Sequence, residues 1–289
     1  MDEVMRSWIL EVLGANDVRE VRTLTFGISS DMRLIEVDGI PLVLRRYVTD
    51  EFVNELPMAV AYEAQALTAA RLVLGNLVPE SVAHDVTGAR SGCPSLIMTY
   101  LPGKPVIHGL DLRRIVEPLA LLHARAAPKD FPRYHHWFDI DRVAIPKWTK
   151  RPETWAELID AVGGGEPSSK HVLLHRDYHP GNLLWEKGTL SGIVDWPSSC
   201  RGPRGIDVAH ARGNLALVDG VGAAEQFLRA YRQIVPSYDH DPWWDMADLL
   251  SFDSDFAGVI AFNAFGAELS IELLYSRADE WAHALTKPI

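Results

Sequence analysis

The chain has 289 residues, of which 47% are hydrophobic and 23% are charged, an ordinary globular composition with enough apolar residues for a sizeable core. Its formal net charge of −11 argues against a nucleic-acid partner, because such proteins present a basic face. Two cysteines give no disulfide framework, the N-terminus has no signal-peptide pattern, and no stretch approaches the roughly 20 apolar residues of a membrane span. We therefore expect a cytoplasmic protein with no membrane partner.

The first fifty residues are predicted to form one helix and three strands. Asp2 can cap a helix, and apolar residues at helical spacing follow it until Gly14, which predicts a helix over residues 2–13. Strands are expected at residues 21–26, 32–37 and 40–47. Asp38-Gly39 has the composition of a tight hairpin turn, so the pattern predicts an antiparallel meander.

The turn between the first two strands contains Gly27, Ser29 and Ser30. Backbone N–H groups and hydroxyls in such a turn can bind a phosphate group. A hairpin turn without a ligand has the same composition, so the turn alone leaves both interpretations open.

Two adjacent arginines, Arg45 and Arg46, lie near the end of the third strand. Because successive side chains of a strand point to opposite faces, only one of the two can face a ligand bound on the sheet. A helix is expected within residues 50–76, beginning near Pro57, because proline is favoured in the first helical turn. Glu63 lies near the start of this helix, either as an exposed glutamate or as the buried partner of a cation.

A connector follows the next predicted strand, residues 95–100. Pro102, Gly103 and Pro105 lie too close together for the strand to continue. We place the domain boundary here, with a β-rich unit at residues 1–100 and a larger unit at residues 101–289. Apolar residues at helical spacing predict helices in the second unit, at residues 111–127, 153–162, 205–218, 221–235, 243–262 and 265–285. The remainder of residues 128–170 shows little pattern and is expected to form a mobile insert.

The most informative segment runs from residue 171 to residue 195. An apolar run leads into a polar loop, a second apolar run and a Lys187-Gly188 turn follow, and a third run ends at Asp195. This hairpin can bring Asp195 beside Asp177 and Asn182, which lie five residues apart on the polar loop. Carboxylate and amide oxygens suit a hard cation such as Mg²⁺, which keeps part of its shell for water and phosphate.

Three histidines, His171, His175 and His179, recur every four residues, a spacing that can bind a metal when it occurs on a helix. Here the histidines cross a strand and a loop that contains Pro180. We therefore interpret His175 as a structural hydrogen-bonding residue and do not predict a zinc site.

The sequence His175-Arg176-Asp177, with Asn182 five residues after the aspartate and Asp195 on the next strand end, matches the spacing of the protein-kinase catalytic loop. The intervening Tyr-His-Pro-Gly and the ending Asp195-Trp196 resemble the aminoglycoside phosphotransferase family, which shares the kinase fold but phosphorylates small molecules. The resemblance implies a two-lobed α+β fold, with Asp177 orienting an acceptor hydroxyl. It also implies that Asn182 and Asp195 hold Mg²⁺ and that ATP or GTP donates the γ-phosphoryl group.

The resemblance assigns roles to further residues along the chain. Arg45 takes the place of the kinase lysine that contacts the nucleotide phosphates, and Glu63 takes the place of the helix glutamate that pairs with it. The turn with Gly27 would cover the phosphates. In the hinge, the backbones of Thr99 and Leu101 would hydrogen-bond the purine, with Met98 behind it.

The resemblance also assigns a role to a residue beyond Asp195. The segment that ends in Asp207-Val208-Ala209 resembles the family's Asp-Leu-Ala segment, so Asp207 would accept hydrogen bonds from the backbone of the catalytic loop. This role is structural and serves catalysis.

The C-terminal helices carry an unusual charge pattern. Residues 233–276 contain eight acids and no lysine or arginine, with aromatic residues between them. Acids and aromatics together suit the recognition of an amine, although a run of acids is also typical of a solvated helix face. The residues proposed to contact a cationic acceptor are Asp239, Asp241, Trp243, Trp244, Asp253 and Asp255.

We expect the acceptor to be an amine-bearing antibiotic, an aminoglycoside or a macrolide. Two alternatives share the same motifs. The first is a metabolic kinase for choline, an amino alcohol or a sugar, since fold analogy does not fix the substrate. The second is an inactive nucleotide-binding module, which Arg45 in place of lysine and the single glycine of the turn favour, but which has no need of Asp177.

Overall fold

The computed structural model describes residues 1–24, 31–49, 58–252 and 254–287. The predicted site residues Gly27, Ser29, Ser30 and Asp253 lie outside these ranges, as does the predicted helix start at Pro57. The chain divides into two compact units, which are Met1–Gly103 with Ser191–Ser199 and Lys104–Leu190 with Cys200–Ile289. The sequence-based boundary at residue 100 did not anticipate that a short later segment, which carries Asp195, belongs to the first unit.

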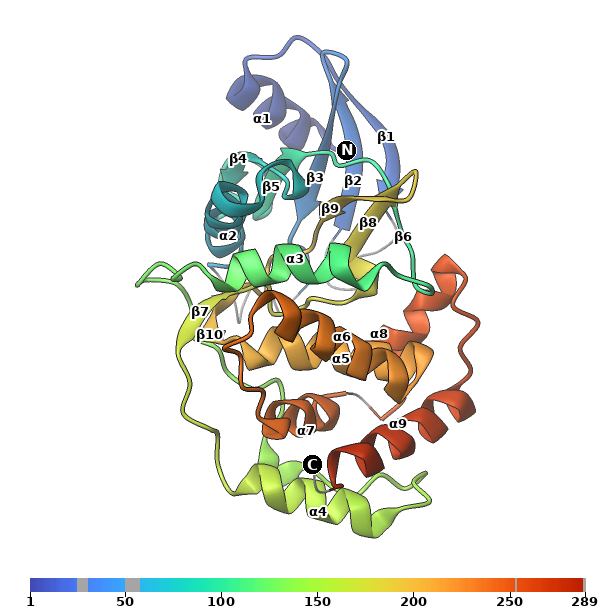
Figure 1. Ribbon diagram of the computed structural model, residues 1–289. Helices are drawn as coiled ribbons and strands as arrows, with labels where there is room; N and C mark the ends of the chain where they lie inside the picture. Colours follow the sequence, from blue (N-terminus) through green and yellow to red (C-terminus); the bar gives the residue numbers. More distant parts are fainter. Residues whose placement is uncertain (25–30, 50–57, 253, 288–289) are drawn as a thin grey trace. The chain divides into compact units, whose positions relative to one another are not determined.

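The first unit is an antiparallel sheet with two helices. Its elements are α1 (Glu3–Leu13), β1 (Val18–Leu24), β2 (Asp31–Val37), β3 (Ile40–Arg46), α2 (Ala59–Leu74), β4 (Ser81–Asp85) and β5 (Ser95–Thr99) (Figure 1). The described strands pair in the order β1-β2-β3-β5-β4. Asp38 and Gly39 both have positive φ, at 46° and 84°, which confirms the predicted hairpin turn between β2 and β3.

Helix α1 begins and ends where its sequence predicts. The Asp2 carboxylate accepts a hydrogen bond from the Met5 backbone N–H at 2.9 Å, and Gly14 closes the helix in the left-handed conformation at φ 62°. Its buried residues pack with Leu42 and Leu44 of β3 in one apolar cluster. Because strand residues alternate between faces, Arg45 points to the opposite face of the sheet, where Glu63 of α2 meets it.

The second unit is mostly helical. Its elements are β6 (Lys104–Pro105), α3 (Leu112–His123), α4 (Pro152–Gly163), β7 (His171–Leu174), β8 (Leu183–Glu186), the first residues of β9 (Thr189–Ile193), β10 (Cys200–Pro203), α5 (Gly205–Asp219), α6 (Val221–Ile234), α7 (Pro242–Leu250), α8 (Ala257–Ile260) and α9 (Ile271–Leu285) (Figure 1). Strand β7 pairs with β10 and β6 pairs with β8, both antiparallel. Within the described ranges, no helix is long and apolar enough to cross a membrane.

Helix α5 is the centre of the second unit. All of its residues from Gly205 to Val218 are buried, as expected of a helix that is enclosed by its neighbours. Helix α7 approaches α5 closely at two glycines. A Cβ atom at Gly205 would lie 2.4 Å from the Trp244 ring, and one at Gly213 would lie 2.4 Å from an oxygen of Asp248. These glycines therefore allow α7 to place Asp248 against α5.

The structure corrects three predictions about this unit. The predicted helix 243–262 is interrupted, because α7 ends at Leu250 and Phe256 takes the left-handed conformation at φ 50°. Helix α9 begins at Ile271, after a positive φ at Gly266. The part of residues 128–170 predicted as a mobile insert instead packs Tyr134, Phe138 and Trp148 against the core of the unit. Single-sequence periodicity missed this packing because its aromatic residues are irregularly spaced.

Candidate active site

The polar loop after β7 is held by Asp207, as predicted. The buried Asp207 carboxylate accepts the backbone N–H of His175 at 2.8 Å and of Arg176 at 2.7 Å. It also contacts Nε2 of His123 at 3.1 Å. Burial alone would raise the pKa of Asp207, but the hydrogen bond and charge of His123 outweigh burial and lower that pKa. His175 is fully buried and its Nδ1 accepts the Asp177 N–H at 3.3 Å, which agrees with a structural role.

The backbone turns sharply just before Asp177. Arg176 has φ 76°, a left-handed conformation that costs roughly 1–3 kcal/mol in a non-glycine residue and must be held by its surroundings. Its guanidinium carbon lies 3.6 Å from the ring centre of Trp137 and 4.6 Å from that of Tyr134. The stacked arginine and the bonds to Asp207 together hold this turn immediately before Asp177.

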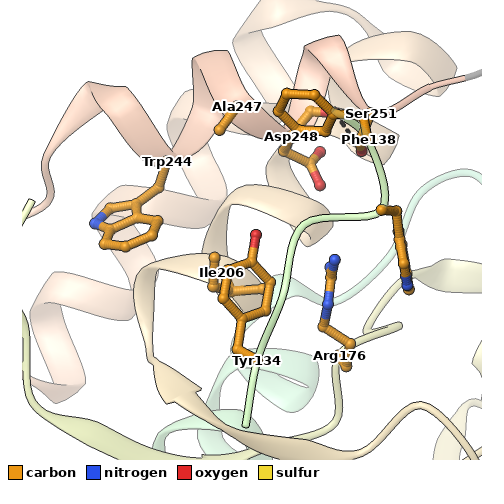
Figure 2. Close-up of a pocket in the computed structure, with 9 residues that line it drawn as sticks. Tyr134, Phe138, Arg176, Ile206, Trp244, Ala247, Asp248 and Ser251 are labelled. Carbon is orange, nitrogen blue, oxygen red and sulfur yellow. Dashed lines mark hydrogen bonds between the residues drawn. The ribbon is translucent and has the colours of Figure 1, made fainter. Parts of the chain in front are cut away.

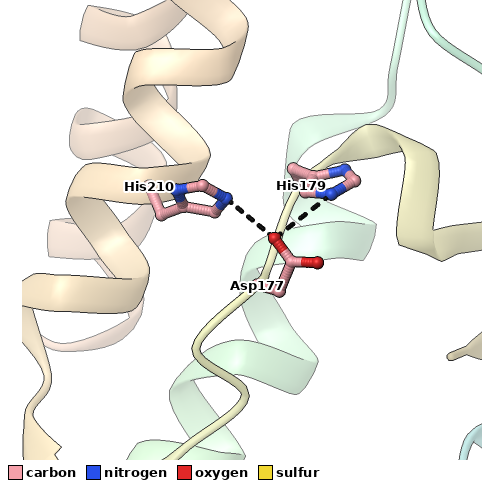
Figure 3. Close-up of side chains that lie close together, drawn as sticks. All are labelled: Asp177, His179 and His210. Carbon is pink, nitrogen blue, oxygen red and sulfur yellow. Dashed lines mark hydrogen bonds and ion pairs between the residues drawn. The ribbon is translucent and has the colours of Figure 1, made fainter. Parts of the chain in front are cut away.

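Asp177 lies at the centre of a polar cluster (Figure 3). Its Oδ1 lies 3.1 Å from Nε2 of His210 and 3.4 Å from Nε2 of His179, and its Oδ2 accepts the Asn182 side-chain N–H at 3.0 Å. His179 Nδ1 accepts the Gly181 N–H at 3.1 Å, which places the proton of a neutral ring on Nε2, facing Asp177. The Asp177 side chain is 27% exposed, so a ligand can still reach it.

The histidines keep Asp177 ionised. Burial would raise the pKa of Asp177, but His179 and His210 outweigh burial and hold the pKa well below its usual range. His210 also contacts Asp248 Oδ1 through Nδ1 at 2.9 Å. Burial disfavours the charged ring, but Asp248 and Asp177 outweigh it and raise the pKa of His210 to about 10. The ring is therefore an imidazolium that donates to two carboxylates.

Asp177, His179 and His210 lie close enough together to suggest a metal site, with one ligand atom from each within 4.8 Å of the others. A metal would require a neutral imidazole with a free lone pair. His210 instead uses both ring nitrogens as donors to carboxylates. The cluster therefore fits a hydrogen-bonded network and not a metal centre.

The oxygen atoms predicted to hold Mg²⁺ suit that ion. The Asn182 side-chain N–H group donates to the backbone carbonyl and the carboxylate of Asp177 at 2.9 and 3.0 Å, which leaves its amide oxygen for a cation. In the first unit, Asp195 is 28% exposed and has φ 70°. An amide oxygen and a carboxylate are ligands that Mg²⁺ accepts, so the donor set fits the implied metal.

The first unit contains the predicted Arg45–Glu63 ion pair. Nη1 of Arg45 lies 2.5 Å from Glu63, and both side chains are 1% exposed. Arg45 also binds Asp195, and the Tyr47 hydroxyl binds Glu63. Arg46 is 21% exposed and pairs with Asp31, so the strand register turns Arg45, and not Arg46, to the side of α2.

Charge and burial oppose each other at this ion pair. Burial lowers the pKa of Arg45, but the charges of Glu63 and Asp195 outweigh burial and place that pKa well above its ordinary value. Burial raises the pKa of Glu63 against the attraction of Arg45. Arg45 therefore stays a cation whose two ends contact different carboxylates, with Asp195 as its exposed partner.

The predicted hinge lies at the end of β5. Met98 is buried, and the Thr99 backbone N–H donates to the Glu80 carbonyl at 3.0 Å. That N–H group is therefore not the one that would meet a purine. Leu101 follows in a half-buried, irregular segment.

The acids predicted to contact an acceptor have several different environments. Asp239 and Asp255 are exposed, and Asp241 caps α7 by accepting the Trp243 N–H at 2.9 Å. Trp243 and Trp244 are buried in the core of the second unit. The structure thus explains most of this acidic stretch by capping, solvation and packing.

A small hollow lies beside the polar loop after β7 in the second unit (Figure 2). Its cavity volume is about 10 Å³, about the size of one water molecule, and it is lined by Tyr134, Trp137, Phe138, Arg176, Ile206, Trp244, Ala247, Asp248 and Ser251. Figure 2 shows the Asp248 carboxylate, the Tyr134 hydroxyl and the Arg176 guanidinium facing the same space.

Sequence reasoning missed two residues of this site, His210 and Asp248. His210 follows Asp207 by three residues on α5, so the two share a helix face. That spacing was the available signal, because it places His210 on the same side of α5 as the loop anchor Asp207 and therefore near Asp177. Asp248 had no local signal, because its place beside His210 depends on the packing of α7 against α5.

Comparisons with known proteins identify the family and the fold. The model of the phosphotransferase enzyme family, APH, matches residues 20–247. A homoserine kinase of Rhodopseudomonas palustris strain HaA2 is 24% identical in a 213-residue alignment that covers 67% of this chain and 62% of that protein.

Two solved structures share the fold at low identity. A thermostable mutant of aminoglycoside phosphotransferase APH(4)-Ia, in ternary complex with AMP-PNP and hygromycin B, has a TM-score of 0.61 at 15% identity, covering 98% of this chain and 99% of that one. The macrolide 2′-phosphotransferase MphH of Brachybacterium faecium has a TM-score of 0.58 at 16% identity, covering 97% of each chain. These similarities confirm the α+β, kinase-like fold expected from the sequence. With most of its length matched by the family model, the chain belongs to the phosphotransferase enzyme family.

Proposed function

We propose that the protein transfers the γ-phosphoryl group of ATP or GTP to a hydroxyl of a small amine-bearing molecule. The observation that carries this proposal is the state of Asp177, an ionised and partly exposed carboxylate held on one loop with Asn182. An inactive binding module would have no use for such a group. The nucleotide complex of the similar APH(4)-Ia structure supports the choice of phosphoryl donor.

In this mechanism Asp177 orients the acceptor hydroxyl toward the phosphorus atom. Its depressed pKa makes it a weak base, so its main contribution is position, and it takes the hydroxyl proton late in the reaction. Asn182 and Asp195 would hold Mg²⁺, which when bound neutralises charge on the phosphate oxygens. These roles agree with a loose transition state that needs little covalent help from the protein.

Arg45 is proposed to hold the nucleotide phosphates. Glu63 fixes one side of its guanidinium in a buried ion pair, which leaves the side that contacts Asp195 for the ligand. Met98 and Leu101 of the hinge are proposed to receive the purine, without the Thr99 N–H group, which donates to Glu80. The proposal includes the turn with Gly27, Ser29 and Ser30 as the phosphate cover.

For the acceptor, we assign the amine-binding carboxylate to Asp248. Asp248 Oδ2 is buried without a hydrogen-bond partner among the described residues. The Asp248 carboxylate lies beside a hollow with aromatic walls (Figure 2). Buried carboxylate oxygens without a partner call for a donor, and an ammonium group beside aromatic rings supplies one. Amine-bearing antibiotics of the aminoglycoside or macrolide type are the first candidates.

A second candidate is a kinase for a hydroxy amino acid. Arg176 has no carboxylate partner among the described residues, and it faces the same hollow as Asp248 (Figure 2). A guanidinium and a carboxylate together match the two charges of an amino acid. The homoserine kinase relative supports this alternative.

A panel assay tests the proposal. The purified protein is incubated with Mg²⁺ and either ATP or GTP, together with hygromycin B, spectinomycin, a macrolide, L-homoserine or choline. We expect one acceptor to gain a phosphoryl group, detected by mass spectrometry and matched by nucleoside diphosphate release. Asp177→Asn serves as the control that should bind nucleotide but not turn it over. The inactive-module alternative would be supported if the protein binds nucleotide but neither phosphorylates any acceptor nor releases nucleoside diphosphate.

A further inference from the structure

A histidine connects the catalytic loop to helix α7. His210 lies on α5 and is 6% exposed. Its Nε2 lies 3.1 Å from Oδ1 of Asp177, and its Nδ1 lies 2.9 Å from Oδ1 of Asp248. The three side chains form a continuous hydrogen-bonded line from the loop to α7.

The His210 ring is confined on every side. The Trp137 ring meets it edge-on at 5.7 Å between centroids, and the Phe252 ring lies nearly parallel to it at 6.1 Å. Asn214 lies one helical turn later, with its side-chain nitrogen 3.3 Å from Nε2. The charged and titratable groups facing the ring are Asp177 and His179 from the loop and Asp248 from α7. A ring held by both nitrogens and packed against two aromatic rings has a fixed orientation.

We propose that His210 is a positioning residue for phosphoryl transfer, which fixes the orientation of the Asp177 carboxylate while Asp248 fixes the imidazole. This inference rests on the phosphotransferase function proposed above. Oδ2 of Asp177 is held by Asn182 from the same loop. Among the residues that the structure describes, Oδ1 has only the longer 3.4 Å contact with His179 besides His210. Without His210, the carboxylate can rotate about its side-chain bonds. A small displacement of a reacting group is enough to reduce turnover by about 100-fold.

The second unit offers a matched control. His240 is also buried at 6% exposure and contacts an acid of α7, with Nε2 lying 2.6 Å from Asp245. Its described partners, Tyr238, Arg212 and Asp245, lie outside the catalytic loop. His240→Gln therefore removes a buried imidazole of the same kind without touching Asp177.

The kinetic test compares His210→Gln with His240→Gln. Turnover is measured with Mg²⁺-ATP and the acceptor from the panel that the wild-type protein phosphorylates. We expect His210→Gln to lower kcat by about 10- to 100-fold and to leave both KM values within about two-fold. His240→Gln should lower the thermal midpoint and keep kcat. Equal kcat values in the two variants would overturn the proposal, and so would a His210→Gln defect confined to the acceptor KM.

A second measurement does not require activity. Imidazole proton–nitrogen spectra of the wild-type protein at about pH 8 should contain one ring, absent from His210→Gln, with both nitrogens protonated, because the pKa of His210 is raised from 6.5 to about 10. A His210 ring with a single proton would overturn the proposal even in an active enzyme. A doubly protonated ring in a protein that phosphorylates no acceptor would support the hydrogen-bonded line of Asp177, His210 and Asp248 and would refute the proposed function.

Discussion

Helices α5 and α7 enclose two histidine–aspartate clusters whose acids are three residues apart on α7. In the first cluster, Asp245 binds Arg212 and His240, and Arg212 also reaches Glu225 of α6 at 2.6 Å. In the second cluster, Asp248 binds His210, which binds Asp177. The first cluster connects helices to one another. The second ends at a carboxylate that is 27% exposed.

The comparison shows that similar residues can serve either stability or ligand contact. A buried ion pair stabilises little by itself, because desolvation offsets most of the attraction, yet removing one partner is costly. The first cluster, which we call the closed cluster because its acid is buried, thus holds the helices together. The second cluster, which we call the open cluster because it ends at the partly exposed Asp177, uses the same kinds of interaction to hold a charge where a ligand can contact it. Function is expected where a buried network reaches the surface.

The largest expected effect comes from breaking the closed cluster. Asp245→Ala removes the carboxylate that is 1% exposed beside Arg212 and leaves that cation without its buried partner. We expect the free energy of unfolding to fall by about 3–5 kcal/mol, measured by urea denaturation. The kcat of the folded variant, measured well below its thermal midpoint, should match wild type. A loss of kcat without a loss of stability would show that the closed cluster also serves the reaction.

The open cluster should respond in the opposite way. Asp177→Asn keeps the size and the hydrogen-bonding oxygen of the side chain but removes its charge, so kcat should fall by about 10² or more. Its unfolding free energy should change much less than that of Asp245→Ala, because Asp177 is partly exposed and already lies next to water. Asp195→Ala is the control, since it should weaken Mg²⁺-nucleotide binding instead. Near-normal turnover of Asp177→Asn would remove the kinase assignment.

The two clusters also show which site residues can be predicted from the sequence. Asp177 and Asn182 were predicted because their signal is local, a fixed spacing on one loop. Asp207 was assigned because its segment resembles the family's Asp-Leu-Ala segment. The choice of Arg45 over Arg46 combined a motif match with the alternation of strand side chains. Asp248 was hidden among eight acids of similar appearance, because only the close approach at Gly213 brings it to His210. Counting acids cannot separate a cap such as Asp241 from a buried partner, since both occur on the same helix.

A smaller effect is expected at the ion pair of the first unit, which extends the comparison beyond α7. Arg45→Lys keeps the charge but loses the fork that reaches Glu63 and Asp195 together. We expect the nucleotide KM to rise several-fold and the acceptor KM to stay unchanged. Arg46→Lys is the matched control, because its partners are the half-exposed Asp31 and the exposed Asp2. A larger nucleotide effect at Arg46 would show that the wrong arginine was assigned to the phosphates.

The smallest effect is expected at the start of α7, where Asp239 and Asp241 are exposed. Asp241→Ala removes the cap at the Trp243 N–H and should cost about 1 kcal/mol of unfolding free energy. The double variant Asp239→Asn/Asp241→Asn should keep the acceptor KM within two-fold, whereas Asp248→Asn should raise it, because we assign the amine to Asp248. A salt titration tests the remaining alternative, in which these surface acids bind the acceptor. A several-fold rise of KM in the double variant that shrinks with added salt would return these surface acids to the acceptor pocket.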